Sequence, residues 1–149
     1  MISALRYDKD VVEELDLSSL EESLKEKLVW VDVTNPTKEE LSILQEKFSL
    51  DPLSIEDVTH KGQRPKVEDY DTYLFTVSHL LNIVENEVET TELFLFLGSR
   101  WLISIHDNES RVTETVKRML RPGESRITSE SAALYHTLID LTVDQYFPV

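Results

Sequence analysis

Two adjacent carboxylates, Glu56 and Asp57, stand just before a basic stretch of the chain. Asp51 and Pro52 predict that they lie on a short helix, because aspartate caps a first turn and proline at its first position leaves no amide unsatisfied. Neighbouring residues lie about 100° apart around a helix axis, so the two carboxylates cannot both face a core. At least one of them therefore faces solvent. Two ordinary surface acids account for the pair, because the chain contains 29 acidic residues.

A second group, His136, Asp140 and Asp144, recurs every four residues near the end of the chain. This spacing places all three side chains on one face of a helix. The two aspartates repel each other by a few tenths of a kcal/mol unless a cation or a basic partner relieves them. A solvated acidic face and a cation-binding face are both consistent with this stripe.

The residues that follow Glu56 and Asp57 form a basic elbow, defined as 61–66 (KGQRPK), whose glycine and proline end the short helix. Three positive charges there balance the preceding acids. We expect Arg64 to anchor the elbow by pairing with a carboxylate, with Asp69 and Asp71 among the candidates. A cation does not ligate another cation, so Arg64 is not expected to bind metal.

Composition excludes several classes of protein. The net charge of −14 repels phosphate backbones and anionic lipids, which argues against a nucleic-acid partner. The chain has no cysteine, no glycine-rich phosphate loop, no G-x-S-x-G turn and no H-E-x-x-H spacing, so no enzyme is indicated. No signal-peptide pattern is present, and the longest stretch without charged residues, 72–84, is too short to span a membrane. We therefore expect a soluble piece without direct membrane contact.

Period-two alternation predicts the strands. They are a hairpin within 2–17 and strands at 28–33, 67–84, 93–97 and 101–105. The run from Val67 to Val84 is largely apolar on both alternating faces, which predicts a long central strand covered on both sides. The polar stretch 84–89 predicts a hairpin turn.

Capping patterns predict the helices. One helix is expected at 18–27, and the capping box of Thr37 and Glu40 begins another. Asn108 or Ser110 caps the next helix, which ends at 122–123. Thr128 or Ser129 caps the last. The inward positions of the second and last of these helices are Leu41, Leu44, Phe48, Leu134, Leu138 and Leu141.

Strands in the middle of the chain with helices before and after them predict an α/β fold, a three-layer α/β/α sandwich with a mixed central sheet. Hairpins are expected to supply its antiparallel pairs, and helical crossovers near 18–27 and 37–60 its parallel ones.

The stretch PLSIEDVTHKGQRPKVEDYDTYLF (52–75) resembles the cytoplasmic domain of the CorA-type magnesium and cobalt channels. The family's acidic pair, short spacer and QRPKVE run are all present. LFLFLGSRWLISIHD (93–107) is similar to the family's next strand pair, and LYHTLIDLTVDQYFPV (134–149) to its long helix that approaches the membrane. The resemblance covers the chain from about Leu28.

The resemblance implies a function. Residues 1–128 are expected to form a cytoplasmic α/β/α domain, and 129–149 the truncated start of a long stalk helix packed on it. In the family, the acidic pair and an aspartate in the LID segment bind Mg²⁺, Co²⁺ or other divalent cations between the subunits of a pentamer and favour the closed pore. These positions are Asp57, Glu56 and Asp140, with Asp144 and His136 as weaker candidates. A further stalk carboxylate and the membrane helices are expected beyond Val149.

Two other functions are consistent with the sequence. The chain is also consistent with the same domain of a zinc-transporting relative, which shares the cytoplasmic architecture. It is equally compatible with a soluble acidic interaction module that has no specific metal site. For the 149-residue chain alone, we expect a folded, weakly associating domain that binds Mg²⁺ no tighter than roughly millimolar.

Overall fold

The computed structural model describes residues 1–149 except 9–10, 17, 19–27, 121–129 and 147–149. Its strands are β1 (Ile2–Asp8), β2 (Val11–Leu15), β3 (Leu28–Thr34), β4 (Lys66–Asp69), β5 (Leu74–Val84), β6 (Glu87–Leu97) and β7 (Trp101–His106). Its helices include α2 (Lys38–Phe48), α3 (Pro52–Thr59), α4 (Arg111–Met119) and α5 (Ser131–Asp144). The helix predicted at 18–27 and the helix end predicted at 122–123 lie outside the described residues.

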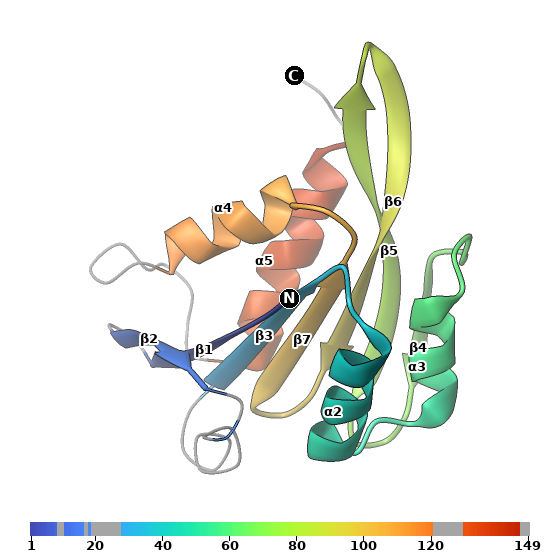
Figure 1. Ribbon diagram of the computed structural model, residues 1–149. Coiled ribbons are helices and arrows are strands. Elements are labelled where there is room, and N and C mark those ends of the chain that lie inside the picture. The colour runs from blue at the N-terminus through green and yellow to red at the C-terminus, as the bar shows by residue number, and fades with distance from the viewer. Residues whose placement is uncertain (9–10, 17, 19–27, 121–129, 147–149) are drawn as a thin grey trace.

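One mixed sheet of seven strands, in the order β2-β1-β3-β7-β6-β5-β4, forms the middle layer. Helices α2 and α3 cover one face and α4 and α5 the other (Figure 1). Side chains alternate between the two faces along a strand, so each face of the sheet has its own core. In β3, Val31 packs toward α2 and α3, while Trp30 packs toward α4 and α5. The predicted three-layer α/β/α architecture is confirmed.

The sheet's parallel pairing differs from the prediction. Among the described strands, only β3 and β7 pair in parallel, and every other neighbouring pair is antiparallel. The segment 18–27 does not connect parallel neighbours, because β1 lies between β2 and β3. The segment 37–60 leads from β3 to β4 at the far edge of the sheet. The sequence had suggested that these two crossovers join adjacent parallel strands. They do not, so that prediction is wrong.

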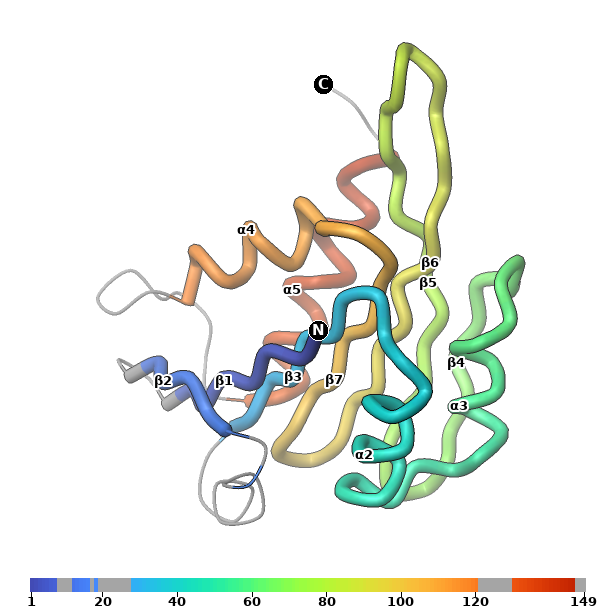
Figure 2. Tube along the Cα trace, viewed as in Figure 1, coloured from blue at the N-terminus to red at the C-terminus, as the bar shows by residue number. Residues whose placement is uncertain are grey.

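Strand β5 is not the central strand that its apolar composition predicts. It is second from the edge, between β4 and β6, and a turn separates it from β4. Its first half is buried on both faces, but Ile83 near its end is 78% exposed. There β5 and β6 extend past the other strands as a hairpin (Figure 2). Glu85 and Asn86, both with positive φ, form the predicted turn.

The helix starts test the predicted caps. Thr37 and Glu40 form the expected capping box of α2, and Ser110 caps α4 through the amide of Thr113. The prediction for α5 is wrong, because its N-cap is Glu130, which makes no side-chain capping bond. The first residue of α5, Ser131, instead donates to the carbonyl groups of the β6–β7 turn. None of the described helices is long and apolar enough to cross a membrane.

Candidate functional site

Helix α3 holds the acidic pair in a defined position at the sheet edge. As predicted, Asp51 caps it, with its carboxylate accepting from the amide of Leu53 at 2.8 Å. The Tyr73 hydroxyl accepts from the amide of Asp51 and bonds the Ser54 hydroxyl. The first turn is therefore fixed to the segment between β4 and β5, and the second turn presents Glu56 and Asp57.

Asp57 is paired with a lysine of the neighbouring edge strand. Lys66 Nζ lies 2.7 Å from Asp57 Oδ2 and 2.5 Å from Glu68 Oε1, and the Tyr70 hydroxyl donates to the other oxygen of Glu68 at 2.9 Å. The hydrogen bonds to Asp57 and then to Glu68 raise the pKa of Lys66. The hydrogen bonds that Glu68 accepts from Lys66 and then from Tyr70 lower the pKa of Glu68. A chain of alternating charge therefore links α3 to β4.

Glu56 and Arg64, which flank this pair, differ from it. Both side chains are exposed, and neither forms an ion pair with another described residue. The prediction that Arg64 anchors the elbow through Asp69 or Asp71 is therefore wrong.

The elbow is anchored by its backbone instead. Glu92 of β6 accepts hydrogen bonds from the amides of Gly62 and Gln63 at 2.6 and 2.8 Å. His79 Nε2 bonds the carbonyl of Gln63, and Lys61 pairs with Asp107. The positive φ of Gly62 turns the two amides toward Glu92.

The acidic stripe of α5 forms as predicted. His136, Asp140 and Asp144 are all exposed, whereas Leu134 and Leu138 on the opposite side of the helix are fully buried. The stripe therefore faces away from the sheet.

The acidic pair and the stripe lie on opposite sides of the molecule. Helix α3, which carries Asp57, packs on one face of the sheet, and α5, which carries Asp140, packs on the other, so the sheet lies between the two helices of one chain (Figure 1). Within the described ranges, no three His, Asp or Glu residues of one chain gather as ligands for a metal ion. A cation shared by both groups needs carboxylates from two copies.

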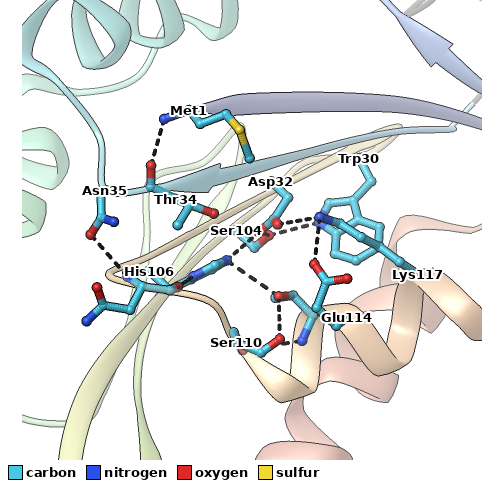
Figure 3. Close-up of polar contacts among 12 residues, drawn as sticks. Met1, Trp30, Asp32, Thr34, Asn35, Ser104, His106, Ser110, Glu114 and Lys117 are labelled. Atoms are coloured by element: carbon cyan, nitrogen blue, oxygen red, sulfur yellow. Dashed lines mark hydrogen bonds and ion pairs between the residues drawn. The ribbon is translucent and has the colours of Figure 1, made fainter.

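A second charged cluster, which the sequence analysis missed, lies between the sheet and α4 (Figure 3). Asp32 of β3 is 3% exposed and accepts from Ser104 Oγ at 2.7 Å, His106 Nε2 at 2.9 Å and Lys117 Nζ at 2.9 Å. Trp30 Nε1 donates to Ser104 at 2.9 Å. We call these five residues the Asp32 network.

The geometry favours a charged pair of His106 and Asp32 in this network. His106 Nδ1 faces the carbonyl of Asn108 at 2.7 Å, and Nε2 faces the Asp32 carboxylate. A carbonyl oxygen and a carboxylate oxygen both accept, so these two contacts favour the imidazolium form, which has hydrogen on both ring nitrogens. Burial opposes that charge, but the hydrogen bond to Asp32 and its negative charge raise the pKa of His106. Burial likewise opposes the charge of Asp32, but His106 and then Lys117 lower the pKa of Asp32.

The Asp32 network does not have the arrangement of a nucleophilic triad. Ser104 donates to Asp32 and not to His106, so the imidazole is not placed to take the serine proton as it does in a triad. The parallel register pairs Asp32 with Ser104 and Thr34 with His106. The signal available in the sequence was an acid inside an otherwise apolar strand, LVWVDV, but its partners depended on a pairing that the sequence did not reveal.

Solved structures show which class of protein has this fold. The soluble domain of CorA from Methanocaldococcus jannaschii superposes with a TM-score of 0.75 at 21% identity, over 98% of this chain and 57% of that one. The full-length CmaX protein gives 0.82 at 13%, over 97% and 45%. The ZntB cytoplasmic domain from Vibrio parahaemolyticus gives 0.72 at 14%, over 97% and 59%. The fold is that of the soluble domain of CorA-type transporters.

Sequence comparison identifies the family. Residues 25–149 match the family described as CorA-like Mg²⁺ transporter protein, and the chain belongs to it. A Bacillus subtilis protein, provisionally named a metal ion transporter, is 32% identical over 120 residues, which cover 80% of this chain and 37% of that protein. The cobalt/magnesium transport protein CorA of Thermotoga maritima is 29% identical over 122 residues, 79% and 35% of the two chains. The chain thus spans little more than a third of these relatives.

Proposed function

We propose that this chain is the cytoplasmic regulatory domain of a CorA-type Mg²⁺/Co²⁺ channel, in which divalent cations bound between neighbouring copies favour the closed pore. Membership of the family supports the class of protein. The observation that carries the regulatory role is the placement of two acidic groups, the Glu56–Asp57 pair and the exposed α5 stripe, on opposite faces of the sheet. Each copy then offers half of a site to each of two neighbours, which suits a ring such as a pentamer.

The donor chemistry of these groups fits a hydrated divalent cation. Glu56 and Asp140 are exposed carboxylates without an ion-pair partner in the described part of the chain, and Asp57 lies beside Glu56. Carboxylate oxygens are hard ligands that Mg²⁺ accepts while it keeps several waters. We assign Asp57, Glu56 and Asp140 as the cation-binding residues, with Asp144 and His136 as secondary ones.

Charge repulsion supplies the regulatory step. Carboxylates of two copies that face one another repel, and a cation between them removes that repulsion and joins the copies. When the cation leaves, the clamp between copies is lost and the assembly opens. The membrane segments and a further stalk carboxylate are assigned to the part of the relatives that this chain does not span.

A titration of the 149-residue chain with Mg²⁺, Co²⁺ and Zn²⁺, followed by backbone amide NMR, tests this proposal. We expect weak, roughly millimolar saturation at residues 55–58 and at 139–141 in the same titration, with an increase in average mass by light scattering. Asp57→Asn should reduce both responses, because the two groups share one cation. Zn²⁺ is included because the ZntB domain has the same fold.

Glu87→Gln in the β5–β6 hairpin is the matched control, since it removes one exposed acid that lies on neither α3 nor α5. Responses confined to the hairpin, or an unchanged response in Asp57→Asn, would contradict the assignment and favour an acidic interaction module.

A further inference from the structure

Lys66 is paired with Asp57, the carboxylate that the proposed function assigns as a cation ligand. Its ammonium bridges Asp57 of α3 and Glu68 of β4, with the three side chains 31%, 26% and 38% exposed. The Phe75 ring lies 5.9 Å from the ammonium and covers it from the sheet side. The pair is thus partly open to water and to ions, unlike a pair inside the core.

A divalent cation at Asp57 must overcome this ammonium. If Lys66 remains in place, two cations share one carboxylate and repel each other. If Lys66 withdraws, Asp57 loses a charge-assisted hydrogen bond that the cation has to replace. Both outcomes lower the affinity of Asp57 for any added cation.

Glu68 provides a second position for the displaced ammonium. Lys66 already contacts Glu68 while it contacts Asp57, so release from Asp57 breaks only one of its two ion pairs. The Tyr70 hydroxyl holds the far oxygen of Glu68 and fixes the direction of the carboxylate. The exchange therefore needs no movement of α3 or β4.

We propose that Lys66 is an internal counter-cation that competes with divalent cations for Asp57 and thereby sets the concentration at which the site fills. This inference rests on the proposed function, in which Asp57 is a cation ligand. A tethered ammonium competes well with monovalent ions, which carry no more charge than it does. A divalent ion carries twice that charge, so Lys66 also favours divalent over monovalent cations.

Substitution of Lys66 by methionine tests the proposal by Mg²⁺ titration of the 149-residue chain. Lys66→Met keeps the apolar stem and should tighten Mg²⁺ binding at residues 55–58 roughly three- to tenfold, with a smaller gain at high ionic strength. Lys66→Arg keeps the charge and should stay near the parent affinity. Lys66→Gln serves as a second neutral variant if the methionine variant folds poorly.

Lys61→Met is the matched control, because it removes one positive charge from the same elbow but pairs with Asp107 instead of Asp57. A gain in Lys66→Met no larger than the gain in Lys61→Met would show that Lys66 only joins α3 to β4, and the proposal would be wrong. In the Asp57→Asn background, Lys66→Met should add no affinity, since its effect passes through Asp57.

The ligand role of Asp57 and the counter-cation role of Lys66 can be overturned separately. If Asp57→Asn leaves Mg²⁺ binding unchanged, Asp57 is not a ligand and the proposed function loses its leading residue. If Asp57→Asn weakens binding but Lys66→Met does not strengthen it, Asp57 remains a ligand and only the counter-cation role is overturned.

Discussion

The Asp32 network and the Asp57–Lys66 pair each contain an aspartate paired with a lysine. Their surroundings differ, and so does the ability of each aspartate to bind an added ligand. Asp32 is 3% exposed and accepts from three side chains. Asp57 lies at the sheet edge, and Lys66 is its only ion-pair partner among the described residues. Burial with several donors makes a carboxylate a fixed part of the core, whereas partial exposure with one exchangeable donor leaves it available to a ligand.

Neutralising the two aspartates should give the largest contrast. Asp32→Asn leaves His106 and Lys117 as buried or half-buried charges without their counter-ion, so we expect a loss of about 3–5 kcal/mol in the free energy of unfolding. Asp57→Asn should cost less than about 1 kcal/mol, because the pair is partly screened by water. Urea denaturation of both variants measures the difference. Comparable losses would remove the distinction between the two regions.

The pH dependence of stability should show the second contrast. The raised pKa of His106 means that its contribution is fully present below the unfolded value of about 6.5 and is lost as pH rises through the folded pKa. The lowered pKa of Asp32 means that its contribution is present above about 3.9 and is lost as pH falls through the folded pKa. The network thus stabilises the protein most between these limits.

His106→Gln tests that sign. The variant should be less stable than the parent near pH 6 and should lose less stability than the parent between about pH 6.5 and 9. Urea midpoints across this range provide the measurement. A parent whose stability rises steadily over the same interval would show that His106 is neutral in the folded protein.

A smaller contrast in stability is expected between two side chains at the basic elbow: Glu92, which bonds its backbone, and Arg64, which is part of it. Glu92→Ala removes the acceptor of two backbone amides and should cost about 1–3 kcal/mol, because those amides lose a charged partner. Arg64→Ala removes an exposed side chain and should change stability by no more than about 0.5 kcal/mol. Thermal unfolding ranks the two variants, and a larger effect of Arg64→Ala would restore Arg64 as the anchor.

These contrasts also show what the sequence can predict. Local rules identified the capping box of α2, the cap of α3 and the β5–β6 turn, because each depends on residues within a few positions of one another. The spacing of His136, Asp140 and Asp144 likewise placed them on one exposed face.

The errors came from pairings between distant segments. The apolar run 67–84 indicated one central strand, yet it forms β4 at the edge and β5 next to it, because strand order is not encoded in the composition of one segment. Arg64 was chosen for its charge, whereas Glu92, which is about thirty residues away in the sequence, anchors the elbow. The partners of Asp32 and Asp57 depend on which strands lie beside them.

Carboxyl-carbon NMR during a Mg²⁺ titration tests the central claim most directly, because it observes both aspartates in one sample. We predict that the Asp57 carboxyl resonance moves with Mg²⁺, and moves at a lower concentration in Lys66→Met, while the Asp32 resonance stays unchanged. An Asp57 signal that does not respond while other surface acids do, or an Asp32 signal that moves with it, would contradict the division between an exchangeable and a fixed aspartate.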